Sequence, residues 1–103
     1  MVKLKHYPIE KLKKEIRQIV GKHLDLKKYK IFFFGSRVRG DSFERADIDI
    51  GIEGPREISA KIKLEIEEEI NQLPTLYKFD IVDFKQVSKK FKKEALKYVE
   101  EIN

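Results

Sequence analysis

The sequence predicts a single α/β domain, in which one sheet of at least three strands is packed against helices. Apolar patterning predicts helices in three segments and strands in three others, in the order helix, strand, strand, helix, strand, helix. The 103 residues are enough for one compact domain, so we expect residues 1–103 to form it without a second lobe.

The first half of the chain predicts a helix, a strand and a polar turn. Apolar residues follow helical spacing over 8–24, and Pro8 occupies the first turn, where proline is tolerated. The run "YKIFFF" at 29–34 is typical of a buried central strand that ends before Gly35. The polar segment that follows, "GSRVRGDSFERA", indicates a loop or a short helical turn.

The second half predicts two further strands and two helices. The segment "DIDIGIE" at 47–53 alternates strictly and is expected to be a strand. Isoleucine then recurs every four residues over 58–73, which predicts a helix that stops before a proline. "KFDIVDF" at 78–84 is the third expected strand, and apolar spacing over 87–102 predicts a C-terminal helix with a lysine-rich start.

Composition limits the classes of protein and partner. Hydrophobic content of 41% supports a folded domain, and the lack of cysteine excludes disulfides and thiol-ligated metals. With no signal-peptide pattern and no apolar stretch near the roughly 20 residues that span a bilayer, we expect a cytoplasmic protein without membrane contact. The net charge of +5 leaves direct nucleic-acid binding open, although no RNA-binding module is visible. His6 and His23 are isolated, so we expect them on the surface and not at a zinc site.

Two aspartates share one face of the expected strand 47–53. Asp47 and Asp49 lie two positions apart, roughly 6–7 Å along a strand, while isoleucines hold the opposite face in the core. Like charges this close repel unless a cation lies between them, and oxygen ligands on a rigid strand suit Mg²⁺. The alternative is that Asp47 caps a turn and Asp49 is an exposed strand residue.

A third carboxylate lies inside the apolar strand 78–84. Burying an aspartate there is costly unless it is paired or bound to a metal. Alternation separates Asp80 from Asp83, and we favour Asp80 as the third metal ligand because Asp83 lies near the strand end. Two metal ions about 3.5–4 Å apart would need such a further carboxylate.

The loop before the D-x-D strand is suited to phosphate. Gly35 lets a ligand approach the backbone, and Ser36 offers a hydroxyl and an amide. Arg37 and Arg39 add charge that matches phosphate oxygens. The alternative is that both arginines form ordinary surface ion pairs. The nearby acidic partners for such pairs are Asp41 and Glu44.

These residues resemble the G-S-x(10)-D-x-D signature of the polymerase-beta-like nucleotidyltransferases. Gly35 and Ser36, ten intervening residues, and then Asp47 and Asp49 fit the spacing without a gap, and the later family carboxylate falls on Asp80. A length near 100 residues is similar to the minimal nucleotidyltransferases (MNT), which are antitoxins paired with HEPN-domain toxins.

The resemblance implies a fold, an activity and a partner. The fold would be a small mixed sheet with helices packed on it. Gly35 and Ser36 would hold the triphosphate of ATP, and Asp47, Asp49 and Asp80 would hold two Mg²⁺ ions. The reaction would transfer AMP to a tyrosine of a HEPN toxin, as in a type VII toxin–antitoxin system. Nucleotidyl transfer to a small molecule or an RNA end stays open, as does an idle module that neutralises its partner by contact alone.

Overall fold

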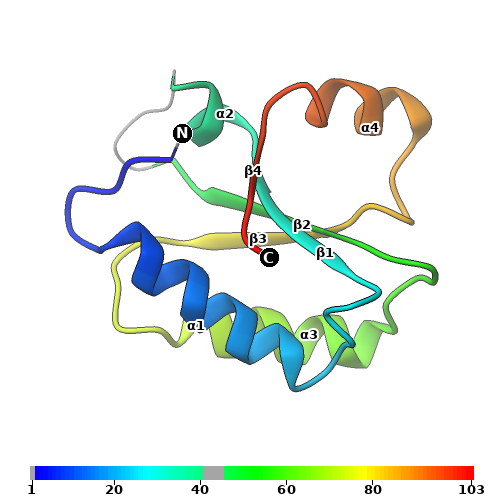
Figure 1. The fold of residues 1–103 in the computed structure, drawn as a ribbon, viewed down its shortest axis with the longest axis horizontal. Helices are drawn as coiled ribbons and strands as arrows, with labels where there is room; N and C mark the ends of the chain where they lie inside the picture. Colours follow the sequence, from blue (N-terminus) through cyan, green and yellow to red (C-terminus); the bar gives the residue numbers. More distant parts are fainter. Residues whose placement is uncertain (1, 41–45) are drawn as a thin grey trace.

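Helices and strands alternate along the whole chain (Figure 1). The computed structural model describes residues 2–40 and 46–103. The elements are α1 (Ile9–Gly21), β1 (Lys30–Phe34), α2 (Ser36–Arg39), β2 (Ile48–Glu53), α3 (Ala60–Asn71), β3 (Phe79–Asp83), α4 (Lys89–Ala95) and β4 (Val99–Glu101). No helix within these two stretches is both long and apolar enough to cross a membrane.

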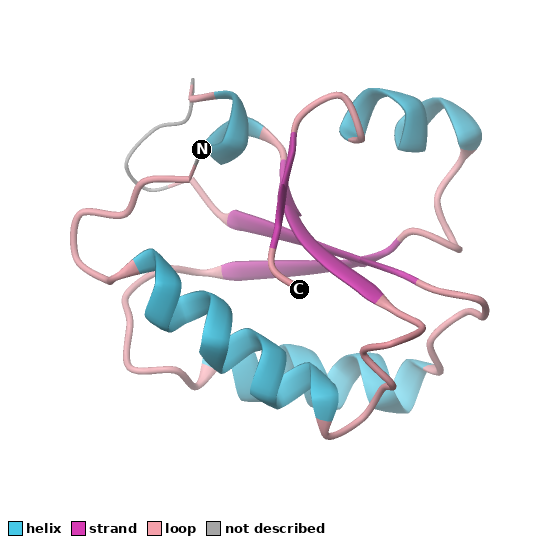
Figure 2. Ribbon diagram, viewed as in Figure 1, coloured by secondary structure: helices cyan, strands magenta, loops and turns pink. Residues whose placement is uncertain are grey.

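The strands form one mixed sheet in the order β3-β2-β1-β4. β1 runs antiparallel to both of its neighbours, β2 and β4, whereas β2 and β3 are parallel. This confirms the small mixed sheet that the sequence resemblance implies. α1 and α3 lie together on one side of the sheet, and α2 and α4 lie on the other (Figure 1, Figure 2). The two faces of the sheet therefore have different neighbours.

The face beneath α1 and α3 is an aliphatic core. Alternate residues of β2 turn toward it, and Ile48, Ile50 and Ile52 have no solvent exposure. The helices add buried side chains at spacings of four residues: Leu12, Ile16 and Val20 from α1, and Ile66 and Ile70 from α3. Burying each such side chain contributes roughly 1.5–3 kcal/mol, which makes this face the main source of stability.

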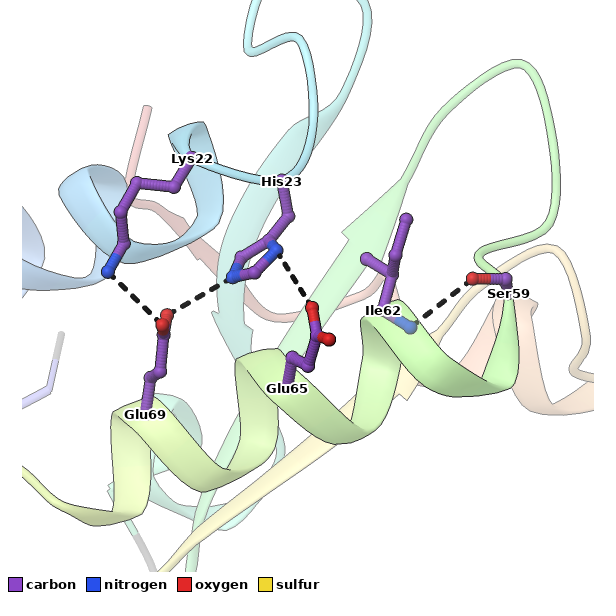
Figure 3. Close-up of polar contacts among 6 residues, drawn as sticks. All are labelled: Lys22, His23, Ser59, Ile62, Glu65 and Glu69. Carbon is purple, nitrogen blue, oxygen red and sulfur yellow. Dashed lines mark hydrogen bonds and ion pairs between the residues drawn. The ribbon is translucent and has the colours of Figure 1, made fainter.

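A polar clamp joins the end of α1 to α3 (Figure 3). Nε2 of His23 lies 3.2 Å from Oε2 of Glu69, and Nδ1 lies 3.4 Å from Oε2 of Glu65. Nζ of Lys22 lies 3.2 Å from the other oxygen of Glu69, and hydrogen bonds from His23 and Lys22 lower the pKa of the Glu69 carboxyl. The prediction that His23 is a surface residue is wrong, because its side chain is only 16% exposed between these glutamates.

Serine caps set the start of the last two long helices. Oγ of Ser59 accepts a hydrogen bond from the amide of Ile62 at 3.2 Å, as Figure 3 shows, so α3 begins at residue 60. Oγ of Ser88 accepts one from the amide of Phe91 at 3.1 Å, and α4 begins one residue later. These caps explain why both helices start two residues after the predicted boundaries.

The opposite face of the sheet carries an aromatic cluster beneath α4. The ring of Phe84 packs edge-on against Phe32 and Phe34, with centroids 4.9 and 5.1 Å apart. Gly51 makes room for it, since a Cβ there would lie 2.4 Å from the Phe32 ring and 2.6 Å from the Phe84 ring. Phe91 of α4 closes the cluster from above, 6.1 Å from Phe34.

The predicted helix over 87–102 is wrong in its second half. α4 ends at Ala95, and Val99–Glu101 forms β4, which pairs antiparallel with β1. Without β4, one edge of the central strand β1 would keep unpaired amides and carbonyls, which is costly for a buried strand. The amide of Ile102 donates to the carbonyl of Ile31 at 2.9 Å, so this edge stays paired beyond β4. Helical spacing from Phe91 to Ile102 was coincidental.

Candidate active site

Two aspartates meet on neighbouring strands, on the face away from the aliphatic core. Asp49 of β2 and Asp80 of β3 are direct partners in the parallel register. Paired residues of adjacent strands point to the same face, and the strands lie about 4.8 Å apart. The structure therefore places the favoured third carboxylate beside the D-x-D strand. Asp47 comes one residue before β2, and its charge reaches Asp49.

Burial and neighbouring charges shift the pKa of the Asp49 carboxyl. The pKa of Asp49 is raised from 3.8 to about 6. Burial is the largest cause, repulsion from Asp80 and Asp47 adds to it, and Arg39 opposes the shift. Asp49 is half-buried, whereas Asp47 and Asp80 are exposed. Ionising Asp49 beside two like charges costs free energy, and a bound cation would remove that cost.

Gly35 is shaped to fit the Asp49 carboxylate. It has φ +82°, a conformation that L side chains rarely adopt. A Cβ at this position would lie 2.3 Å from Oδ2 of Asp49, so the backbone here touches the carboxylate directly. The carbonyl of Gly35 accepts from the amides of Val38 and Arg39 and starts α2. Ser36, the first residue of α2, consequently lies next to the carboxylates.

The two arginines of α2 have different environments. Arg37 is buried, and its Nε and Nη2 donate to the carbonyl of Ala46 at 3.2 and 2.7 Å. Its guanidinium also lies 5.1 Å from the centroid of the Tyr77 ring. Arg37 thus ties α2 to the entrance of β2, a structural role that the sequence did not indicate.

Arg39 is exposed and acts electrostatically on Asp49. It is therefore better placed than Arg37 to meet a phosphate that arrives at the carboxylates. Nucleotide binding by either arginine remains a prediction. The alternative ion partners, Asp41 and Glu44, lie outside the described residues.

Asp83, the other candidate for the third carboxylate, has a structural role. It is buried, and its oxygens accept from the amides of Ile58 at 2.8 Å and Lys85 at 2.9 Å. It faces the side of β3 opposite to Asp80. Asp83 lies at the end of β3, as the sequence indicated, and there it caps backbone amides at the edge of the core.

The carboxylates are suited to a hard divalent cation, because they offer oxygen ligands and negative charge on one face of the sheet. Because Gly35 has no side chain, its backbone lies directly against the carboxylate of Asp49. Asp49 and Asp80 lie side by side, and Arg39 offsets their repulsion only in part, since the pKa of Asp49 stays raised. Within residues 2–40 and 46–103, however, no three His, Cys, Asp or Glu side chains are already arranged around a common metal position. Asp47 would have to join the pair as a third ligand.

The family model described as polymerase beta nucleotidyltransferase matches residues 14–102, which include all of these side chains. The chain belongs to the polymerase beta nucleotidyltransferase family. A search among curated proteins finds no match. The assignment therefore depends on the family model, with the fold and the Gly-Ser and D-x-D residues in agreement.

Several solved structures share the fold of this chain. A toxin–antitoxin crystallised with AMP-PNP contains a chain that is 18% identical, with a TM-score of 0.73, and the match covers 88% of this chain and 72% of that one. A complex of tri-AMPylated Shewanella oneidensis HEPN toxin with MNT antitoxin gives 16% identity, a TM-score of 0.70, and coverage of 91% and 71%. A putative nucleotidyltransferase from Sulfolobus solfataricus gives 20% identity, a TM-score of 0.52, and coverage of 89% and 77%. At these identities the likeness establishes the fold.

The sequence did not indicate two contacts that shape this site. The stacking of Arg37 on Tyr77 and its bonds to Ala46 join residues up to forty positions apart, and no local pattern announces them. Gly35 carried a signal, because a glycine directly after a buried strand lets another group approach the backbone closely. The contact of the Gly35 backbone with Asp49 depends on the register of β1 against β2, which the sequence alone does not give.

Proposed function

We propose that this nucleotidyltransferase is a protein adenylyltransferase that transfers AMP from ATP to a tyrosine hydroxyl of a HEPN-domain toxin, and so acts as its antitoxin. The observation that carries the proposal is the pairing of Asp49 with Asp80 against the backbone of Gly35. That arrangement supplies carboxylates for a metal-bound triphosphate at the end of an otherwise apolar sheet. The two toxin–antitoxin structures with the same fold supply the class of partner.

Asp47, Asp49 and Asp80 would hold Mg²⁺. Bound there, two ions would offset the charge of the triphosphate and lower the pKa of the acceptor hydroxyl. Asp49 would be ionised in that state, because a cation reverses the effect of its like-charged neighbours. The backbone at Gly35 and Ser36 would face the phosphates, and Arg39 would offset part of their charge.

The transfer itself needs little covalent chemistry from the protein. The acceptor oxygen forms a bond to the α-phosphorus, and the bond from the α-phosphorus to the bridging oxygen breaks, so that pyrophosphate leaves with the electron pair. The hydroxyl proton goes to Asp80 or to water. Asp47 and Asp80 are exposed, so a hydroxyl carried by a second protein can reach the site.

The direct test is incubation of the chain with ATP, Mg²⁺ and the HEPN-domain protein of the neighbouring gene, followed by intact-mass spectrometry. We expect the partner to gain the mass of one or more AMP units. Asp49→Asn should slow the transfer on the order of 10²–10³-fold while the fold survives. The matched control is Asp25→Asn, in an exposed loop where the side chain accepts a hydrogen bond from the amide of Lys27, and it should leave the rate unchanged.

An unmodified partner in the presence of active wild-type chain would contradict the proposal. AMP found instead on a small molecule or an RNA end would move the activity to that acceptor. If Asp49→Asn still silences the toxin in cells as well as the wild type does, neutralisation occurs by contact and not by transfer.

A further inference from the structure

Four large apolar side chains near the C-terminus lie exposed on α4, on β4 and in the turn between them. Phe91 is 42% exposed, Leu96 38%, Tyr98 55% and Val99 41%. We call these four residues the α4–β4 patch. Single exposed apolar residues are ordinary on protein surfaces, but a group of them often marks a contact with another molecule. Two of the four have a common neighbour, because the Phe91 ring packs against Phe34 and Val99 is the strand partner of Phe34.

The patch lies in line with the candidate active site. Val99 pairs with Phe34, Phe34 pairs with Asp49, and Asp49 pairs with Asp80, so one row crosses all four strands. Directly paired residues share a face of the sheet, and each strand adds about 4.8 Å. Val99 is therefore roughly 10 Å from Asp49, on the same face. A protein seated on the patch would reach the carboxylates without crossing the sheet.

The patch has a firm base. The ring of Phe91 packs 6.1 Å from Phe34 and 5.9 Å from Phe84, at the edge of the aromatic cluster. Lys92, the next residue, forms an ion pair with Glu53 of β2 and fixes α4 against the sheet. The exposed side chains thus continue a packed cluster outward to solvent, which preorganises them for binding.

Lysines border the patch. Residues 85–101 contain six lysines and three glutamates. Among the glutamates, Glu100 contacts Lys13 of α1 and so faces the other side of β4. In the parts of the chain that the structure describes, no carboxylate pairs with the exposed lysines Lys85, Lys89, Lys90 and Lys93.

We propose that the α4–β4 patch docks the protein that carries the acceptor hydroxyl, through a surface with an apolar centre and an acidic border. This inference rests on the proposed function, because it assigns the place where the protein substrate binds. Charge complementarity favours an acidic partner, and the row from Val99 to Asp80 directs that partner to the site. A second copy of this chain fits poorly, since it would bring lysines against lysines.

The test measures partner affinity and AMP transfer separately. The probe is the HEPN-domain protein of the neighbouring gene, titrated calorimetrically into the full chain without ATP. We expect the double variant Leu96→Ser and Tyr98→Ser to weaken binding at least about 10-fold, as loss of a buried apolar anchor does. Leu64→Ser is the matched control, because Leu64 is 55% exposed on α3, on the other side of the sheet.

Charge reversal tests the border of the patch. Lys89→Glu with Lys93→Glu should weaken binding and reduce its dependence on salt concentration, whereas Lys61→Glu on α3 should do neither. Each variant should bind AMP-PNP as the wild type does, and its unfolding temperature should stay within a few degrees of the wild-type value. Asp49→Asn should lose transfer and keep partner affinity.

The outcomes separate the two proposals. Wild-type chain that binds the partner through the patch yet adds no AMP overturns the proposed function and leaves the docking surface in place. Equal partner affinity of the Leu96/Tyr98 variant and the wild type overturns the docking surface, even where AMP is transferred. So does a wild-type dimer that this variant dissociates, or competition for the patch by single-stranded RNA.

Discussion

The two faces of the sheet differ in what they do, although they are built from the same strands. Ile48, Ile50 and Ile52 of β2 point into the aliphatic core and are fully buried. Asp49, between two of them, points to the other face and meets Asp80. The comparison shows that one rigid strand can hold a repelling pair of charges, because the free energy that fixes it comes from the opposite face.

The largest effect on stability is expected from truncating a side chain of the aliphatic core. Ile50→Ala should lower the free energy of unfolding by about 3 kcal/mol, since it leaves a cavity in a well-packed face. The loss appears in urea or thermal denaturation followed by circular dichroism. The molecules that remain folded should bind AMP-PNP as before. A large loss of nucleotide affinity at full folding would mean that the two faces are coupled.

Alanine substitutions at Gly35 and Gly40 should separate the effect of a steric clash with Asp49 from the effect of backbone strain. Gly35 and Gly40 both have positive φ, so alanine at either position should cost about 1 kcal/mol of stability or somewhat more. Only at Gly35 would the Cβ meet the Asp49 carboxylate, whereas nothing lies within 4 Å of a Cβ at Gly40. Gly35→Ala should therefore reduce the transfer rate about 10²-fold, an effect comparable to the loss of one stabilising group. Equal rates for the two variants would show that strain alone matters.

The free energy of unfolding should depend on pH through Asp49, the half-buried carboxyl of the candidate active site. The pKa of Asp49 is raised in the folded state, so between about pH 4 and 6 the folded chain binds more protons than the unfolded chain. Without Mg²⁺, the contribution of Asp49 to stability therefore falls as pH rises through this window, by about 1 kcal/mol after screening of a half-exposed group. Asp49→Asn should remove that decrease. Equal slopes of stability against pH for the wild type and the variant between pH 4 and 6 would contradict the raised pKa of Asp49.

The sequence predicted best what depends on short-range pattern. The alternation of isoleucine and aspartate in β2 predicted which side chains face the core and which face the candidate site. The position of Asp80 in an apolar strand led to the prediction that it lies near Asp49, and the two are strand partners. The phosphate-binding role of Gly35 and Ser36, inferred from spacing and from the family resemblance, stays a prediction. Alternation within a strand is readable from the sequence because backbone geometry sets the direction of each side chain.

The sequence failed where long-range pairing decides. Residues 96–102 have helical spacing, yet Val99–Glu101 pairs with β1 because the central strand needs a second neighbour. The bonds of Arg37 to the carbonyl of Ala46 were not indicated by the sequence, although nucleotide binding by Arg37 stays a prediction. His23 looks isolated, and two glutamates of α3 surround it. Each case joins segments that only the folded chain brings together.

The most direct measurement is the titration of the Asp49 carboxyl by carbon-13 NMR, in the wild type and in Asp80→Asn, with and without Mg²⁺. The account predicts a wild-type pKa of about 6 without metal, a lower value in Asp80→Asn, and a marked decrease when Mg²⁺ is added to the wild type. A pKa of Asp49 that neither Asp80→Asn nor Mg²⁺ changes would contradict the claim that carboxylates of two strands share one cation site.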